Sequence, residues 1–252
     1  MRKIILMLFV VCSTTVAQNV DALFEDANNF YKNENYKQAL DLYKQIESTQ
    51  KVSSELYFNL GNCHYLLNQL ALSIYNYEKA LRLNPLNEDA KNNLLIAKKL
   101  TIDRIETLPQ TLLQKINNRF IQKLHYNTWA YFSVLFSALS CLFFILFYLS
   151  HMPTKKRLFF SISLICFSFL IISLYVSYRQ FNLFKNKKEA IVFALEIPVK
   201  NAPTVNSDQI FTLHEGTKIF VLDTLDDWKK IKLADGKIGW LKGDAIQIID
   251  NF

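Results

Sequence analysis

Two long apolar stretches lie in the middle of the chain, at Trp129–Leu149 and Leu158–Tyr178, and neither contains an acidic or basic residue. Each stretch is about 21 residues long, and a helix needs about 20 apolar residues to cross the core of a bilayer. The pattern predicts two transmembrane helices joined by a short loop, residues 150–157. Because such a hairpin crosses the membrane twice, the segments before and after it must lie on the same side.

The first 17 residues have the pattern of a secretory signal peptide. Basic residues at positions 2 and 3 precede the apolar run Ile4–Val11, and Ala17 is a small residue suited to cleavage. The loop between the two spans carries Lys155–Arg157, which agrees with the excess of cations in cytoplasmic loops. The segments that flank the two spans outside the loop hold more cations in total than the loop does. The predicted orientation in the membrane therefore depends mainly on the signal peptide. We expect a protein of the cell inner membrane, with a cytoplasmic loop and both soluble segments in the periplasm.

The segment before the spans contains two copies of a helical repeat. Residues 20–53 and 54–87 align at a period of 34, which is typical of a solenoid of helical hairpins. The small and large positions correspond between the copies: Ala27 with Gly61, Ala39 with Ser73, and Tyr43 with Tyr77. In the second copy Tyr57, Leu60, Gly61, Tyr77, Ala80 and Pro85 resemble the tetratricopeptide repeat pattern. A helix over Glu88–Ile102 is expected to cap the last repeat with Leu94, Leu95 and Ala97, completing a domain at residues 18–104.

The resemblance to tetratricopeptide repeats implies a concave surface that holds an extended peptide. Six candidate peptide-binding residues recur at the repeat period on the first helix of each copy: Phe24, Asn28, Tyr31, Phe58, Asn62 and Tyr65. In such a groove an Asn bonds the backbone of the ligand, and the aromatic residues contact its apolar side chains. An alternative stays open at this stage, because an aromatic stripe at helical spacing also fits a packed core. Phe24 and Phe58 replace the lysines that would clamp a carboxylate, so an acidic C-terminus is not the expected ligand.

The connector, residues 105–128, includes a second amphipathic pattern over Thr111–Leu124. Apolar residues fall on one side of this predicted helix, and Lys115, Arg119 and Lys123 lie beside them. An apolar face edged with cations is suited to the membrane interface. A helix that continues the solenoid fits the same pattern.

After a linker, residues 179–188, the periodicity changes to short β segments over residues 189–252. The predicted strands are Ala190–Phe193, Lys218–Asp223, Trp228–Leu233, Lys237–Lys242 and Ala245–Ile248. Asp235-Gly236 between two of them predicts a tight hairpin turn. 

The residues of this last segment resemble a bacterial SH3 domain. The resemblance is carried by Val199–Pro203, Leu213–Thr217, Trp228 and Gly239–Leu241. It implies a small β-barrel that binds cell-wall peptides or other proteins, with Pro203, Trp228 and Trp240 as candidate surface residues. Trp240, which follows Gly239, is expected in the core of the barrel rather than on its surface.

Composition and candidate chemistry favour interaction over catalysis. The net charge of +7 is not concentrated outside the membrane flanks, so we expect contact with the lipid bilayer and no nucleic acid. Cys63 is the one cysteine outside the signal and the spans, which predicts no disulfide framework and no zinc site. The four histidines are scattered, and no phosphate loop or nucleophile arrangement is found in the sequence. We therefore expect a protein that is not an enzyme and has no cofactor and no metal.

The order of the parts as a whole resembles the BatE family of the aerotolerance operon. The fold class is a multi-domain α + β membrane protein with an α-solenoid, a two-helix transmembrane hairpin and a small SH3-like β-barrel. The resemblance implies partners among other membrane proteins of a Bat-type complex, which carry von Willebrand A-type and tetratricopeptide domains, and a MoxR-type ATPase. The expected function is a non-enzymatic scaffold on the periplasmic side. Two alternatives are a peptidoglycan-binding sensor that uses the barrel and an assembly subunit that self-associates through the hairpin.

Overall fold

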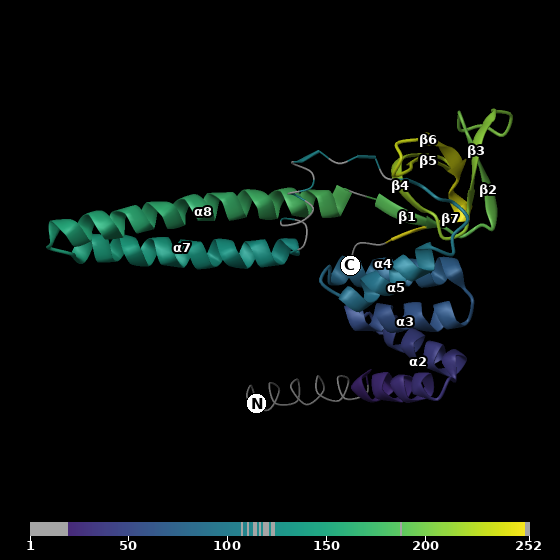
Figure 1. Ribbon diagram of the computed structural model, residues 1–252, viewed down its shortest axis with the longest axis horizontal. Coiled ribbons are helices and arrows are strands. Elements are labelled where there is room, and N and C mark those ends of the chain that lie inside the picture. Colours follow the sequence, from purple (N-terminus) through teal and green to yellow (C-terminus); the bar gives the residue numbers. More distant parts are fainter. Residues whose placement is uncertain are drawn as a thin grey trace, which may run out of the picture. The chain divides into compact units, whose positions relative to one another are not determined.

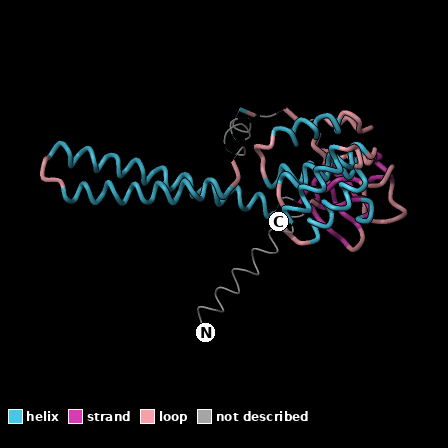
Figure 2. Tube along the Cα trace, turned by 90° about the horizontal axis from the view of Figure 1, so that it is seen from below, coloured by secondary structure: helices cyan, strands magenta, loops and turns pink. Residues whose placement is uncertain are grey.

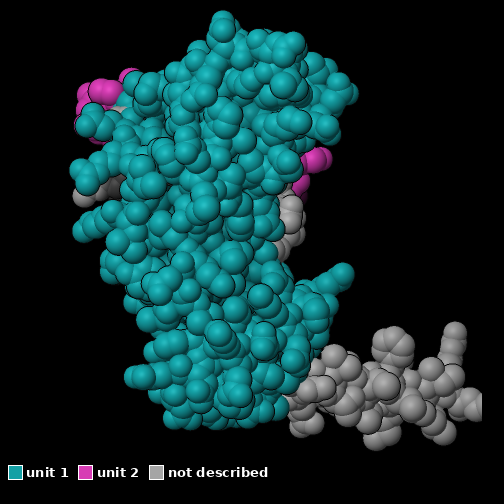
Figure 3. Space-filling view, turned by 90° about the vertical axis from the view of Figure 1, so that its right-hand side faces the viewer, with its two compact units in different colours: residues 1–108, 188–250, 252 teal, residues 109–187, 251 magenta. Residues whose placement is uncertain are grey.

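The computed structural model describes residues 20–106, 108–109, 111–112, 115, 117, 121, 124–186 and 188–249. The chain forms two compact units, one of residues 1–108 and 188–250 with 252, and one of residues 109–187 with 251 (Figure 3). A helical region, two apolar helices and a C-terminal antiparallel sheet follow one another, as the sequence predicts (Figure 1). The predicted signal peptide, residues 1–17, lies outside the described residues, and so does most of the predicted amphipathic helix of the connector.

The helical region contains a helix at residues 20–32 followed by α2 (Tyr36–Ser48), α3 (Ser54–Leu66), α4 (Leu70–Leu83) and α5 (Glu88–Lys98). Side chains cap two of these helices at their N-termini. The Ser53 hydroxyl accepts the N–H of Leu56 at the start of α3, and the Asn87 side chain accepts the N–H of Ala90 at the start of α5. Such caps satisfy backbone donors that have no partner within the helix.

Small and large residues meet between the helices, as the repeat pattern predicts. A Cβ added to Gly61 would lie 2.6 Å from the ring of Tyr77, so only glycine fits there. Ala27, Ala39 and Tyr43 are fully buried in the same region. The expected cap is shorter than predicted, because α5 ends at Lys98. Its Leu94 and Ala97 are buried, but Leu95 is 55% exposed and does not cover the repeat.

The two apolar helices of the second unit, α7 (Tyr126–Leu149) and α8 (Pro153–Asn186), lie side by side (Figures 1 and 2). Both are long and apolar enough to cross a membrane, and only 6% and 17% of their most apolar windows are buried. Serines join them: the hydroxyl of Ser133 donates to that of Ser173 at 2.9 Å, and Ser163 donates to the Ser140 carbonyl at 3.0 Å. Small hydroxyl residues at a helix interface allow the close approach expected in a membrane.

The helical hairpin extends beyond the predicted spans at both ends. Pro153 begins α8, so Lys155–Arg157 lie in the helix and not in the connecting loop. The helix ends at Asn186, so the predicted linker of residues 179–188 is wrong for most of its length. The hydropathy pattern marks only the apolar part of a helix, whereas the backbone hydrogen bonds continue through polar residues with good helix propensity.

The C-terminal part is a single seven-stranded antiparallel sheet with the order β3-β2-β6-β5-β4-β1-β7. Its strands are β1 (Lys188–Val192), β2 (Glu196–Lys200), β3 (Gln209–His214), β4 (Lys218–Leu225), β5 (Trp228–Lys232), β6 (Ile238–Lys242) and β7 (Ile246–Ile248). Five correspond to predicted strands, but β2 and β3 were not predicted as strands. Pro198 within β2 obscures its pattern, since proline is uncommon inside strands.

The sheet bends around one apolar core. Its register shifts between Val199 and Lys200 and again between Val221 and Asp223, and such bulges increase the local bend and twist. Val199, Ile231 and Leu241 are fully buried inside. The predicted turn at Asp235-Gly236 is confirmed, because Gly236 has a φ of 95° between β5 and β6.

Candidate interaction site

Two asparagine side chains of the helical region form the same hydrogen-bond pattern. Asn28 Oδ1 accepts the hydroxyl of Tyr43 at 2.6 Å and the amide of Asn59 at 3.2 Å. One repeat later, Asn62 Oδ1 accepts the hydroxyl of Tyr77 and the amide of Asn93, both at 2.8 Å. Each side-chain oxygen is therefore held by two internal donors, and both asparagines stay partly exposed.

The asparagines that donate to Asn28 and Asn62, which are Asn59 and Asn93, were not predicted from the sequence. Asn59 and Asn93 are separated by 34 residues, the same interval that relates Asn28 to Asn62 and Tyr43 to Tyr77. A search for every polar residue that recurs at the repeat period would have found them. The recurrence shows that the asparagines are oriented by the repeat itself.

Three of the six predicted groove residues line one pocket. Tyr31, Asn62 and Tyr65 meet Leu66, Tyr77, Asn93 and Ile96 around a cavity of about 110 Å³. None of these seven lining residues carries a charge. A site with amide and phenol groups and an apolar wall suits a neutral segment of peptide rather than an ionised group.

The other three predicted residues are outside this pocket. The ring of Phe24 packs edge-to-face on Tyr43 at 5.6 Å, and that of Phe58 packs on Tyr77 at 6.2 Å. Both phenylalanines are half-buried against the core of the repeats. Asn28 belongs to the equivalent hydrogen-bond set of the first repeat.

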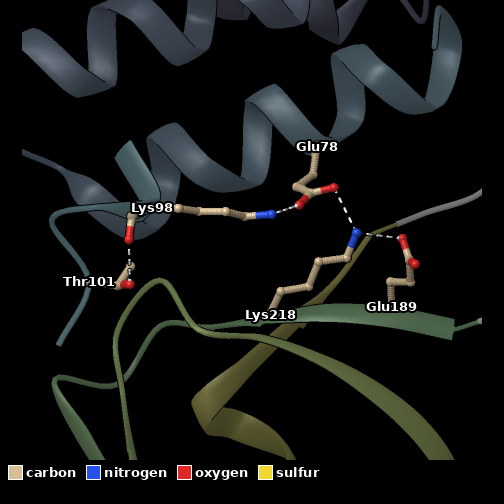
Figure 4. A network of polar contacts seen from close by, with 5 residues as sticks. All are labelled: Glu78, Lys98, Thr101, Glu189 and Lys218. Carbon is tan, nitrogen blue, oxygen red and sulfur yellow. Dashed lines mark hydrogen bonds and ion pairs between the residues drawn. The ribbon is translucent and has the colours of Figure 1, made fainter. Parts of the chain in front are cut away.

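Buried ionic contacts join the helical region to the sheet (Figure 4). The Glu78 carboxylate on α4 lies 2.7 Å from Lys98 on α5 and 2.7 Å from Lys218 on β4. Lys218 also lies 3.0 Å from Glu189 on β1. Burial alone would raise the pKa of Glu78, but the two ammonium groups outweigh it and lower that pKa to about 2.

Further contacts surround this network. Asp103 accepts the N–H of His214 at 2.7 Å and the hydroxyl of Thr217 at 2.6 Å. Burial opposes ionisation of Asp103, yet these hydrogen bonds hold its pKa below the ordinary value. Gly216, with φ of +82°, allows a close approach here, since an added Cβ would lie 2.9 Å from Ile74 on α4.

An apolar cluster continues the same contact. Tyr75 packs edge-to-face on Phe193 at 5.8 Å, and Ile74 shares a buried cluster with Ile191 and Ile249. The repeats and the sheet therefore form one folded unit rather than two modules that fold separately.

The two candidate tryptophans of the sheet lie on adjacent strands and on one face. Trp228 on β5 pairs with Lys242 on β6, and Lys230 on β5 pairs with Trp240 on β6. Trp240 is half-buried and does not belong to the core of the sheet, so its expected core position is wrong. Gly239 and Leu241 face the core instead, because side chains alternate along a strand. The third candidate, Pro203, lies in the loop between β2 and β3.

Two reactive side chains in the repeats are buried in structural positions. Cys63 is fully buried, and burial raises the pKa of its thiol to about 12. His64 is 2% exposed, and its Nδ1 lies 2.5 Å from the Gln69 amide oxygen. Burial lowers the pKa of His64 below its ordinary value, so this imidazole is a packed, neutral group.

Comparison with known families agrees with both parts of the first unit. Residues 54–87 match a family model of the tetratricopeptide repeat, and residues 196–247 match one of the bacterial SH3 domain. The comparison with curated proteins found no match to the chain. Tetratricopeptide repeats and SH3 domains are typically non-catalytic interaction modules, so the pair suggests binding to proteins or to the cell wall.

Proposed function

We propose that this protein is a membrane-anchored, non-enzymatic scaffold that binds a neutral peptide segment of a partner protein in the pocket lined by Tyr31, Asn62 and Tyr65. The main observation behind this proposal is the repeated hydrogen-bond set that fixes the Asn62 oxygen, in a side chain that lines an uncharged pocket. In this proposal the amide nitrogen of Asn62 donates to the peptide. An amide donor beside aromatic rings suits an extended backbone with apolar side chains. The whole predicted groove, with Phe24, Asn28 and Phe58, is part of this proposal.

In this proposal α7 and α8 anchor the chain, and the repeats and the SH3-like part lie together in the periplasm. The buried contact between Glu78 and Lys218 supports a shared compartment, because two parts that pack together cannot lie on opposite sides of a membrane. The order of the parts favours a Bat-type complex for aerotolerance or envelope stress, with von Willebrand A-type and tetratricopeptide partners. Reporter fusions at Thr154 and at Phe252 test the topology, with a cytoplasmic signal expected only at Thr154.

The test of the pocket is capture of partner proteins by the full chain carrying Asn62→Asp. Aspartate keeps the oxygen that accepts from Tyr77 and Asn93 but removes the amide N–H donors. We expect partner capture to fall strongly, and capture by the matched variant Asn92→Asp, on the exposed side of α5, to stay at the level of the unmodified chain. Equal capture by both variants would contradict the proposal.

A second candidate function is cell-wall binding by the SH3-like part. The observation that favours it is the outward position of Trp228 and Trp240, whose rings are half-buried on the outer face of the sheet and partly accessible to a ligand. Purified full-length protein in detergent would then sediment with peptidoglycan fragments. Sedimentation that is lost with Trp228→Ala plus Trp240→Ala would favour this function over the scaffold.

A further inference from the structure

Trp240 lies between two lysines on the outer face of the sheet. Across one ladder it pairs with Lys200 on β2, and across the other it pairs with Lys230 on β5. The ammonium group of Lys230 lies 5.8 Å from the centre of the Trp240 ring. The neighbouring pair repeats the motif, because Lys242 lies 5.8 Å from the ring of Trp228. We call Trp228, Lys230, Trp240 and Lys242, with Lys200, the Trp–Lys face.

Exposed aliphatic residues extend this face along the same side of the sheet. Ile238 precedes Trp240 by two residues on β6 and is 46% exposed. Leu225 pairs with Trp228 and is 51% exposed. Aromatic, aliphatic and cationic groups are thus interleaved on one surface of adjacent strands.

The charge on this face is unevenly distributed. At the Trp228 end, Asp226 and Asp227 occupy the turn between β4 and β5 and share a hollow with Lys242. Near Trp240, Asp223 pairs with Lys230, and the two lysines that pair with Trp240, Lys200 and Lys230, outnumber this carboxylate. The Trp240 end is therefore the cationic end of the face.

We propose that the Trp240 end of the Trp–Lys face binds the anionic lipid headgroups of the membrane in which this protein is anchored. Tryptophan is favoured at membrane interfaces, where its ring contacts the acyl boundary and its N–H stays in the headgroup layer. Lysines close to an anionic membrane surface are attracted to it and strengthen binding. The exposed side chain of Ile238 fits the acyl boundary of the bilayer.

Chain connectivity keeps this face within reach of the lipid. The proposal rests on the proposed membrane anchoring, in which the apolar part of α8 ends at Tyr178. The eight residues from there to Asn186 span about 12 Å of helix at ~1.5 Å each, and only residue 187 separates α8 from β1. The headgroup layer on each side of a bilayer is itself several ångströms thick. The SH3-like part is therefore tethered next to the headgroups.

The experiment uses full-length protein reconstituted into nanodiscs of neutral phosphatidylcholine or of phosphatidylcholine with phosphatidylglycerol. The chain has three tryptophans, so Trp129→Phe plus Trp228→Phe leaves Trp240 as the single fluorescent reporter. We expect its emission to move to shorter wavelength, and its quenching by a headgroup-depth quencher to increase, in the anionic discs. High salt should reverse both changes, because the Debye length falls from ~10 Å at 0.1 M to ~3 Å at 1 M. Trp129→Phe plus Trp240→Phe reports Trp228, which should respond less.

Charge variants and a competing ligand complete the test. Lys200→Gln plus Lys230→Gln should abolish the response, whereas Lys37→Gln plus Lys44→Gln, which removes the same charge from the exposed side of α2, should preserve it. Equal Trp240 emission in neutral and anionic discs would overturn the inference while leaving the anchoring intact. A response to soluble peptidoglycan fragments in neutral discs, with none to anionic lipid, would overturn it in favour of the wall. Failure of the protein to enter any bilayer would overturn the anchoring itself, and the inference with it.

Discussion

The carboxylate of Glu78 and the ammonium group of Lys218 lie 2.7 Å apart although 140 residues, including both apolar helices, separate them in the chain. Both side chains are largely buried. Separating the repeats from the sheet would break this ion pair, which would either expose both groups to water or leave an unpaired charge buried. The pair therefore couples the folding of the repeats to the folding of the sheet.

The first prediction concerns removal of one partner from this network. Glu78→Gln should destabilise the first unit by about 2–4 kcal/mol, because loss of one member of a buried ion pair leaves the other uncompensated. Glu189 still pairs with Lys218 in the variant, which moderates the loss. Chemical denaturation of the detergent-solubilised protein measures the effect. The matched variant Glu88→Gln breaks the exposed pair with Lys91 and should cost under about 1 kcal/mol; equal losses would argue against a buried coupling.

The second prediction is a loss of stability in acid. Glu78 has a folded-state pKa of about 2 and Asp103 also has a lowered pKa. A carboxyl whose pKa is depressed by folding contributes stability above its unfolded pKa, and that contribution is lost as the pH falls toward the folded value. Stability should therefore decline from about pH 5 downward, near the unfolded carboxyl values of ~4. Denaturation curves between neutral pH and pH 3 should show a flatter decline for Glu78→Gln; parallel curves would contradict the assignment.

The third prediction concerns His64 and a milder pH range. Burial lowers the pKa of His64, so below about pH 6.5 the unfolded chain binds a proton that the folded chain refuses. Stability should fall as the pH drops through this range, by at most about 1.4 kcal/mol per pH unit for one group. His64→Gln should reduce this slope while the acid decline stays, and His125, whose pKa burial also lowers, contributes what remains. The decisive measurement is the free energy of unfolding between pH 7.5 and 5.5; a slope that is unchanged in the variant would assign it to another group.

The fourth prediction tests the close contact of Gly61 with Tyr77. Gly61→Ala places a methyl group within 2.6 Å of the Tyr77 ring, and overpacking of this kind costs about 1–3 kcal/mol. Adding Tyr77→Leu should relieve the clash, so the double variant should lose less than the sum of the two single losses. Additive losses in thermal unfolding would show that the two residues do not meet.

Local periodicity explains what could be predicted from the sequence. The 34-residue repeat, the two apolar stretches and the Asp235-Gly236 turn each depend on residues close together in the chain, so their patterns identify helices, apolar spans and a hairpin directly. The end of α8 was not predicted from the apolar stretch, because the polar residues that follow the stretch continue the helix to Asn186.

The contacts that define the candidate surfaces depend on residues far apart in the chain, and only the tertiary structure decided them. The period showed that Asn28 and Asn62 correspond, but not that their oxygens are held by tyrosine and asparagine from other helices. Trp240 was expected in the core because the resemblance to SH3 domains implies a core position for the residue after Gly239. Val199 is buried against Gly239 on the inner side of the sheet, and β6 pairs with β2 at Trp240. Trp240 follows Gly239 directly, so its side chain lies on the outer side. Side-chain packing across the sheet, a non-local property, determined which residues are available for binding.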